Sequence, residues 1–598
     1  VSEPQTRIFI APWGGDSQVY NTENLTAAAG IKSLFSLVSK NNTILVQDAG
    51  AMRNKDAVKD GVSTTGQLNG DALVNGDVIY AAGAAQKGVF SPKGSFGSAL
   101  FITAPGDNVY SAVRRSTSST TSGSDSGSSS SKVIETYGSA AGTTGGAANA
   151  QPGANASAIV AGVLALGAQG NQAMDVRWAK HALARSSVIL DSMANRVATE
   201  TDAGYKGWQT NAAGLSFSND YGFGMVDAAK FVEASKNIAY VSVAGTENVD
   251  LTSNRSFTKT DAKTLTANIS KIVSTQKALE SVELTINLQN VDILGKLVDG
   301  NVAKGTSIVL KHISDSGHVT TSELLSTTYN NSNSSVQENW SWTFVSNAFW
   351  GESTKGKWEL EIVYKDNFGT SSVQVNPDLA KIVSASLKFN TGEIKNESDI
   401  SGVYNSQVLE VRSFVWDSKN PFTIAENSAM NAQDAIVLNE GTLAVNGVLG
   451  SIDKIDKLEK GSRIFVNNGT LAIGESGQVS TARGTDVLGG ELKFNAGGSI
   501  SGGVRLYNGA INIAGGSTTT TLGSVDIYGG TMSVWRESGS QLASLQGSVT
   551  MRGGELNLSN CRGITVAANA GTTTISLGTV AGTINVGTNN YWESKTRD

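Results

Sequence analysis

The sequence has little cysteine, histidine or proline. Its 598 residues include one cysteine, three histidines and seven prolines. One cysteine cannot form an internal disulfide. Because large extracellular β-solenoid proteins of bacteria are also poor in cysteine, this scarcity does not indicate the cytoplasm. The longest apolar run, residues 158–166, is far below the roughly 20 residues of a membrane-spanning helix, so we predict no membrane span.

Dense clusters of basic residues are also missing. The formal net charge is −6, and no run of Lys and Arg is suited to neutralising phosphates, so we expect no nucleic-acid partner. The first residues show neither the basic stretch nor the apolar core of a signal peptide, so we expect the leader of an exported protein to be absent from this chain or removed.

Glycine is abundant. It accounts for 67 residues, and 39% of the chain is apolar, which excludes general disorder. High glycine with low proline favours turn-rich β structure. The length predicts roughly three to five structural units at about 100–200 residues each.

Residues 1–242 alternate between apolar strand-like runs and helical periodicity. Strands are expected at residues 7–10, 43–47, 78–81 and 101–103, and helices at residues 24–39, 156–166 and 175–186. This alternation predicts an α/β unit with a parallel sheet. Residues 116–132 are rich in Ser, Thr and Gly and are predicted to be a mobile surface loop.

Two further patterns follow. Residues 243–385 alternate with period two, as in Leu284–Leu288, which predicts an antiparallel all-β sandwich. In residues 386–598 a pentad recurs about every 19–28 residues, a spacing typical of one turn of a β-solenoid. The pentads begin at Gly441, Gly469, Gly490, Gly509, Gly530, Gly554 and Gly582.

Specific motifs lie within the α/β unit. They are residues 11–15 (APWGG), 44–50 with Phe90-Ser91, Gly94 and Ala104-Pro105, 158–162 with Val176-Arg177-Trp178, and Trp208, Asn211, Gly214, Ser218, 221–224 (YGFG) and Asp227-Ala228. Together they resemble the C-terminal half of a subtilisin-like serine protease domain of the kexin/proprotein convertase type.

The next unit extends the resemblance. Residues 340–344 (WSWTF), 349–352 (FWGE), Gly356, 358–362 (WELEI) and Asp366 resemble the P domain that follows the catalytic domain in kexins. A subtilisin-like domain followed by a glycine-rich solenoid, expected to be a right-handed parallel β-helix, resembles the passenger of a bacterial autotransporter. Such proteins carry an outer-membrane barrel, expected here beyond Asp598.

The catalytic residues of the resembled family are not intact. A subtilisin-like enzyme uses Asp, His, a nucleophilic Ser and an oxyanion-binding Asn. This sequence has Asn155 at the nucleophile position, with Ser157 two residues later as the alternative, and Ala51 at the oxyanion position. The family's Asp and His precede the strand with which this chain begins, so we expect them on an N-terminal half outside it.

The chain's own histidines offer no replacement base. His181 is interpreted as a helix residue at the surface or at the edge of the core, and His312 and His318 as solvated loop residues. Neither interpretation gives a histidine at the expected position of the base.

Three further candidate sites remain. The resemblance implies calcium, which subtilisin-like and P domains often bind, whereas hydrated surface carboxylates are the simpler interpretation; the candidates are Asp220, Asp227, Asp315 and Asp366. The tryptophans at 340, 342, 350 and 358 form either a binding surface or, more simply, the sandwich core. Cys561 is expected to be an inert core thiol.

Three hypotheses follow. The first is a secreted surface protein of a Gram-negative bacterium, in which a degenerate protease domain binds a protein or builds structure, as an adhesin does. The second is a serine endopeptidase that is active only with a separate N-terminal fragment supplying Asp and His, with Ser157 as the nucleophile. The third is self-association through unpaired sheet edges around residues 1–50. No cofactor is predicted apart from the calcium considered above.

Overall fold

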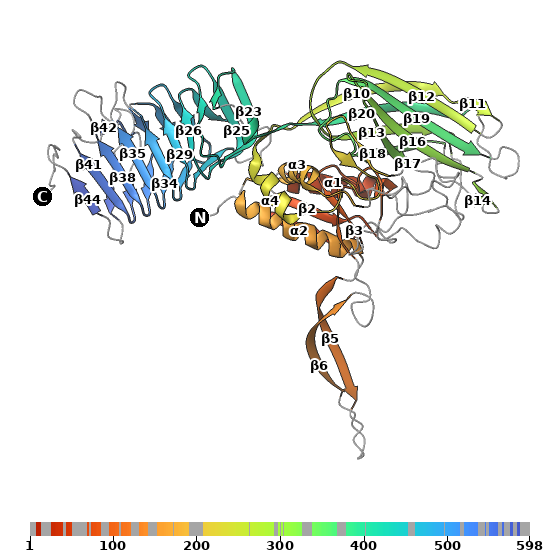
Figure 1. Cartoon of the computed structure of the whole chain (residues 1–598), viewed down its shortest axis with the longest axis horizontal. Coiled ribbons are helices and arrows are strands. Elements are labelled where there is room, and N and C mark those ends of the chain that lie inside the picture. Colours follow the sequence, from red (N-terminus) through yellow and green to blue (C-terminus); the bar gives the residue numbers. More distant parts are fainter. Residues whose placement is uncertain are drawn as a thin grey trace, which may run out of the picture.

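The computed structural model (Figure 1) contains an α/β unit, a β-sandwich and a β-solenoid in chain order, which confirms the multidomain fold class. It describes residues 7–13, 25–39, 43–50, 68–70, 73–84, 95–106, 109–120, 131–141, 152–171, 173–190, 207–261, 264–291, 297–298, 301–302, 304–325, 338–366, 378–400, 402–452, 461–495, 497–514, 520–535, 544–545, 549–559, 565–566, 575–577 and 583–586.

A four-stranded parallel sheet forms the centre of the α/β unit, in the order β1-β2-β3-β4. Its strands are β1 (Arg7–Ala11), β2 (Thr43–Asp48), β3 (Ile79–Ala84) and β4 (Ile102–Pro105). The helices are α1 (Leu25–Ser39), α2 (Pro152–Gly170), α3 (Val176–Ser186) and α4 (Ala228–Asn237). The predicted alternation of strands and helices is therefore confirmed. Short elements complete the unit: a hairpin of β7 (Gln209–Thr210) and β8 (Ser216–Phe217), and a 3₁₀ turn at Leu68–Gly70.

Helix α2 packs across the strands of this sheet. Val160 and Leu164 are fully buried in the same core as Ile79 and Ile102. Among the described helices, α2 is also the one long and apolar enough to span a membrane by length and composition, with 44% of the window Gly153–Gly170 buried within the protein.

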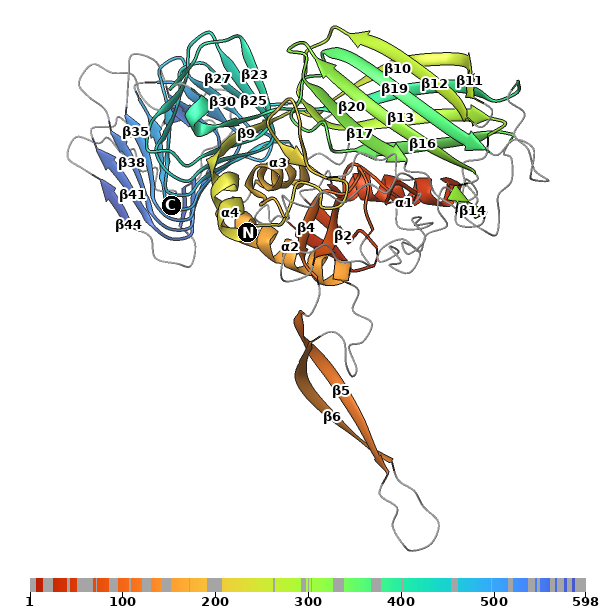
Figure 2. The same cartoon turned by 45° about the vertical axis from the view of Figure 1, so that its right-hand side comes forward.

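The prediction of a loop over residues 116–132 is wrong in part. β5 (Tyr110–Thr120) and β6 (Ser131–Ala141) form an antiparallel hairpin that projects away from the rest of the protein (Figure 2). A composition poor in apolar residues excludes a packed core, but it does not prevent two strands from satisfying each other's backbone hydrogen bonds.

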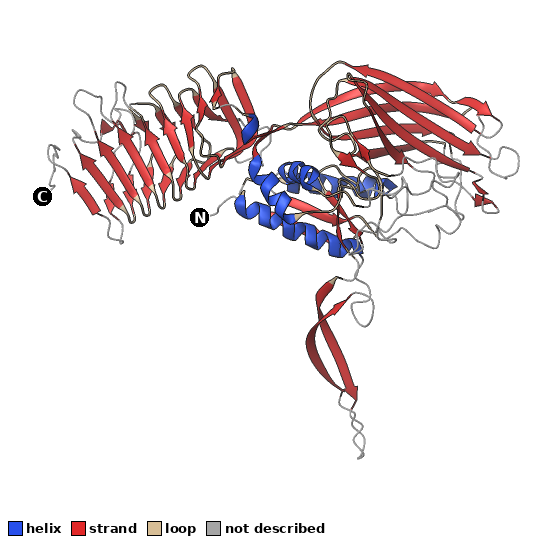
Figure 3. Cartoon of the chain, viewed as in Figure 1, coloured by secondary structure: helices blue, strands red, loops and turns tan. Residues whose placement is uncertain are grey.

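The sandwich consists of two antiparallel sheets (Figure 3). One contains β10 (Gly245–Ser256), β20 (Lys381–Thr391), β13 (Leu279–Gln289) and β18 (Trp340–Ser346). The other contains β11 (Thr258–Asp261), β12 (Thr264–Val273), β19 (Gly356–Asp366), β16 (Lys304–Ser314) and β17 (Val319–Leu325). A short hairpin of β14 (Leu297–Val298) and β15 (Asn301–Val302) lies apart from them.

The tryptophans divide between two cores. Trp340, Trp342 and Trp358 lie in the sandwich core, as the simpler interpretation of the sequence expects. Trp350 does not, because its ring packs edge-on against Phe101 of the α/β unit, with ring centres 5.3 Å apart. The sandwich therefore contributes a large aromatic side chain to the core of the preceding unit.

Parallel strands stacked in rows make the solenoid, and this repeat is confirmed. One row is β25 (Ala429–Leu438), β28 (Arg463–Val466), β31 (Thr485–Val487), β34 (Val504–Leu506), β37 (Val525–Ile527), β40 (Val549–Met551) and β43 (Ile575–Leu577). A second row continues from β25 through β27 (Val448–Ser451), β30 (Gln478–Ser480), β33 (Ser499–Ser501), β36 (Thr521–Leu522), β39 (Ser544–Leu545) and β42 (Thr565–Val566). A third row is β22 (Val403–Tyr404), β24 (Phe422–Ile424), β26 (Thr442–Val445), β29 (Thr470–Ile473), β32 (Glu491–Phe494), β35 (Ala510–Ala514), β38 (Thr531–Trp535), β41 (Glu555–Ser559) and β44 (Thr583–Val586).

Glycine is required where successive turns of the solenoid meet. Gly530 has φ of 74°, and a Cβ atom at this position would lie 2.6 Å from the carbonyl oxygen of Gly509 one turn below. A left-handed backbone and this close approach both favour glycine at this position.

The start of the solenoid is covered by a strand from the α/β unit. β9 (Ile238–Ser242) pairs with β23 (Val408–Trp416) and with β21 (Ile394–Asn396), which precedes a 3₁₀ turn at Glu397–Asp399. Tyr240 of β9 is buried in the solenoid core. β9 lies inside the range expected for the first domain, but its hydrogen bonds belong to the third.

Candidate functional site

The start of α2 is where the resemblance expects the nucleophile. The side-chain Nδ2 of Asn155 donates to the carbonyl oxygen of Gly106 at 2.9 Å. Ser157 is fully buried, and its hydroxyl donates to the carbonyl oxygen of Ala154 in the same helix turn at 2.9 Å. Neither side chain is free to attack a carbonyl group.

A carboxylate lies against the same end of α2. A Cβ atom at Gly153 would overlap the carboxylate of Asp48, the last residue of β2. Asp48 is 2% exposed and accepts a hydrogen bond from the backbone N–H of Gly50 at 2.7 Å. Burial raises the pKa of Asp48 against the opposing effect of that hydrogen bond. A negative charge here opposes an oxyanion forming at the helix N-terminus. Ala51, the expected oxyanion position, lies outside the described residues.

The second polar cluster joins α3 to the sandwich. Asp175 caps α3 by accepting from the backbone N–H of Trp178 at 2.8 Å. On the helix face turned toward the sandwich, Arg177 forms a bidentate pair with Glu280 of β13, with both N–O distances 2.7 Å. Burial disfavours the carboxylate of Glu280, but the charge of Arg177 and the hydrogen bond from His181 outweigh it, so the pKa of Glu280 lies well below its usual value.

His181 lies beside this pair and is 1% exposed. Its Nε2 is 2.8 Å from Glu280 Oε1, and its Nδ1 is 3.1 Å both from Trp350 Nε1 and from Arg185 Nη1. Burial lowers the pKa of His181 against the opposing effect of Glu280. The expectation of a residue at the surface or edge of the core is therefore wrong, because the sandwich covers this face of the helix.

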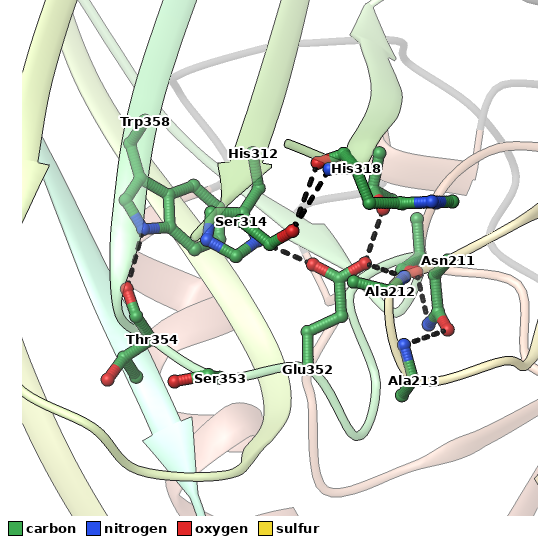
Figure 4. Close-up of polar contacts among 12 residues, drawn as sticks. Asn211, Ala212, Ala213, His312, Ser314, His318, Glu352, Ser353, Thr354 and Trp358 are labelled. Carbon is green, nitrogen blue, oxygen red and sulfur yellow. Dashed lines mark hydrogen bonds and ion pairs between the residues drawn. The ribbon is translucent and has the colours of Figure 1, made fainter. Parts of the chain in front are cut away.

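A buried histidine–carboxylate pair occupies the other part of the interface (Figure 4). His312 Nδ1 is 2.6 Å from Glu352 Oε2, and both side chains are fully buried. Glu352 Oε1 accepts from the backbone N–H of Ala212 at 2.6 Å and from the hydroxyl of Thr320. The prediction of a solvated loop at His312 is wrong, since His312 lies within β16 and its ring stacks on Trp358 with ring centres 4.3 Å apart.

His318 is exposed in the turn after β16, as expected, and its Nε2 is 2.8 Å from the carbonyl oxygen of Thr210 in the α/β unit. The hydroxyl of Ser314 contacts the backbone of His318 and not its ring (Figure 4). These residues therefore do not form a serine–histidine pair.

Asn211 belongs to the motif block of the α/β unit, and it also binds the sandwich. Its Nδ2 donates to the carbonyl oxygens of Ala348 and Trp350 at 3.0 and 2.9 Å. Part of that block therefore serves to dock the following unit.

The calcium candidates are not gathered into one site. Asp227 caps α4 through the backbone N–H of Lys230, and Asp315 pairs with Lys355 at 2.7 Å. Asp220 has a half-buried position, and Asp366 is the last residue of β19. Among the described residues, no three His, Cys, Asp or Glu side chains come together as a metal-binding group. Cys561 lies outside the described residues.

Glu280 was not singled out from the sequence, and Asp48 and Glu352 appeared there only as members of longer motifs with no role of their own. Glu280 and Glu352 stand in or beside strand-like segments, where a lone carboxylate resembles an exposed strand residue. His181, the partner of Glu280, is 99 residues away in the chain, and His312, the partner of Glu352, is 40 residues away. Only the fold brings these groups together.

Comparison with known proteins agrees with this architecture. Residues 308–376 match the proprotein convertase P-domain family. The chain is 26% identical over 231 residues to the dibasic-processing endoprotease of Schizosaccharomyces pombe, covering 36% of this chain and 31% of the relative. It is 24% identical over 235 residues to the Aeromonas extracellular serine protease of Aeromonas sobria, covering 37% of this chain and 36% of the relative. The chain therefore spans about a third of these relatives.

A solved structure is also similar. The crystal structure of the serine protease of Aeromonas sobria matches with 19% identity and a TM-score of 0.44, covering 64% of this chain and 71% of that one. By sequence, the α/β unit and the sandwich are similar to a subtilisin/kexin-like protease domain and to the P domain. In this chain a β-solenoid follows that pair.

Proposed function

We propose that this chain belongs to a secreted bacterial surface protein, similar to an autotransporter passenger, whose subtilisin/kexin-like domain has lost catalysis and serves in binding or in building structure. The observation that carries the proposal is the start of α2, where the amide of Asn155 and the hydroxyl of Ser157 are both held by backbone carbonyl oxygens. The carboxylate of Asp48 beside this helix end further supports it. Folds commonly persist when the chemistry of a site is lost.

Export is proposed from the similarity to an extracellular protease of Aeromonas sobria. A Gram-negative cell surface is proposed from the combination of a protease-like domain with a solenoid. A stack of solenoid turns would hold the two preceding domains away from the cell surface, where they could contact a partner.

The test of lost catalysis is labelling of the native secreted protein with a fluorophosphonate probe, followed by mapping of adducts by mass spectrometry. We expect no adduct at Ser157, beside a subtilisin-like protease that is labelled under the same conditions. Ser157→Ala is the matched control, because it separates an adduct at this residue from one elsewhere. An adduct at Ser157 that disappears in Ser157→Ala would support the alternative, a serine endopeptidase completed by another segment carrying Asp and His.

Self-association is a second candidate role, favoured by the edge of the sheet. In the described part of the chain β1 pairs only with β2, and its Phe9 and Ile10 side chains are 55% and 44% exposed. Strands of parallel sheets are usually buried on both faces, and an apolar edge strand recruits others. Light scattering over a wide concentration range tests this role, since a monodisperse monomer throughout would contradict it.

A further inference from the structure

All three histidines of this chain lie where the P domain meets the α/β unit. His181 contacts Glu280 and Trp350, His312 contacts Glu352, and His318 contacts the carbonyl oxygen of Thr210. Histidine is the side chain that ordinarily changes charge between pH 5 and 8. The side chains that ordinarily titrate between pH 5 and 8 therefore all lie at one interface.

The hydrogen bonds of His181 fix its protonation state. The indole N–H of Trp350 and a guanidinium N–H of Arg185 both point at Nδ1, so this nitrogen must act as an acceptor and carries no hydrogen. Nε2 faces the carboxylate of Glu280 and carries the hydrogen. The docked arrangement is thus complete only with a neutral imidazole at His181.

The charges around His181 oppose a further proton. Its own helix carries Arg177, Lys180 and Arg185, and the facing β13 supplies the single carboxylate of Glu280, which is already engaged by Arg177. Trp350, from the connection after β18, is uncharged. Burial lowers the pKa of Lys180 to about 8, with Asp77 and Glu280 opposing that shift. An imidazolium would add a positive charge to this face and face two donors at Nδ1.

We propose that acid loosens the docking of the P domain on the α/β unit at α3, with the neutral ring of His181 as the sensor. Because its pKa is lowered when docked, the docked form binds a proton less readily than the released form. The docking equilibrium is therefore fully favourable above the ordinary imidazole pKa of about 6.5, and it falls by up to about tenfold per pH unit below that value. Glu280 stays ionised throughout this range, since its pKa is far lower.

The contacts of His312 indicate which side of the interface stays closed. Its Nδ1 faces Glu352 and its Nε2 faces the carbonyl oxygen of Lys355 at 3.2 Å, so both ring nitrogens face acceptors. The contact between Glu352 and Ala212 involves no atom of His181, so we place the hinge there, while the contact between α3 and β13 opens.

The test is hydrogen–deuterium exchange of the full chain between pH 8 and 5, corrected for intrinsic exchange rates and read from peptides that cover α3 and β13. We expect these peptides to lose at least tenfold protection in the unaltered protein between pH 6.5 and 5. His181→Gln should keep its protection, because a glutamine amide can donate and accept hydrogen bonds but cannot take up this proton. His318→Gln, the exposed control, should lose protection as the unaltered protein does. Unchanged protection to pH 5, or equal loss in His181→Gln, would overturn the proposal.

A second measurement does not depend on the fold of His181→Gln. In the full chain labelled with ¹³C-histidine, the three ring signals report each protonation state directly, and His318→Gln removes the signal of the exposed ring. We expect one remaining ring to keep the neutral chemical shift below pH 6 and to change only as exchange protection of α3 is lost. If both remaining rings titrate near pH 6.5 with no loss of protection, the proposal is wrong.

Discussion

Asp48 and Gly153 lie so close together that a Cβ atom at residue 153 would overlap the carboxylate of Asp48. The contact places a negative charge at the positive end of α2, where the resembled enzymes require room for a reacting carbonyl group. It thereby connects the expected nucleophile position at the start of α2 with the packing of the sheet.

Gly153→Ala should destabilise the protein by about 1–3 kcal/mol, because the added methyl group must displace a buried carboxylate. Gly162→Ala is the matched control in the same helix, since its Cβ would meet nothing within 4 Å. This control should be neutral or stabilise by up to about 1 kcal/mol. Thermal unfolding of the full chain compares the two, and equal shifts would contradict the close contact.

Asp48→Asn should change how stability depends on pH. The pKa of Asp48 is raised by burial, so the folded state holds its proton more tightly than the unfolded chain does. The stability contributed by the protonated form is present below about pH 3.9, the ordinary value for Asp, and is lost as pH rises through the raised pKa. An asparagine at residue 48 does not titrate, so the variant does not lose this stability as pH rises. The difference in free energy of unfolding, variant minus unaltered protein, should therefore increase between pH 4 and 7. A constant difference over that range, measured by urea unfolding, would count against a raised pKa.

Glu352→Gln should weaken the interface strongly. The substitution removes the negative charge opposite His312. It also weakens the hydrogen bonds that the side chain of residue 352 accepts from Ala212 and Thr320. Leaving buried hydrogen-bonding groups without a matched partner costs about 1–3 kcal/mol each. Glu359→Gln, whose partly exposed pair with Lys357 is worth about 0–1 kcal/mol, is the control. Limited proteolysis between the two units should accelerate in Glu352→Gln alone.

Gly530→Ala should destabilise the solenoid by more than about 1 kcal/mol, since it combines a left-handed backbone with a Cβ 2.6 Å from the carbonyl oxygen of Gly509. Gly503→Ala is the matched control, because its Cβ would make an ordinary contact 3.7 Å from Ser524. Urea unfolding followed by far-ultraviolet circular dichroism distinguishes them. Similar losses for both would show that the turns are not limited by this approach.

The architecture followed from local patterns. The helical spacing of residues 24–39 led to α1, and the pentads at Gly441 and Gly469 led to β26 and β29. Such patterns are readable because a helix or strand buries side chains at a fixed period. The hairpin of β5 and β6 was missed for the converse reason, since residues 116–132 contain almost no apolar residues whose spacing could predict a strand.

The interface could not be read in this way. His312 has the same neighbours in sequence whether it lies in a loop or under Trp358, and Glu280 meets its partners only after the sandwich has folded and docked. Trp350 looked like a sandwich residue because its neighbours in sequence are, although its ring lies in the core of the other unit.

The sequence by itself determined the order of the three units, the solenoid repeat and the asparagine at residue 155, where the resemblance expects a serine, because each depends on residue identity and local spacing. The tertiary structure decided that Ser157 is buried, that Asp48 lies at the start of α2, and that every histidine lies at one interface. Those features depend on contacts between segments far apart in the chain, and only packing fixes them.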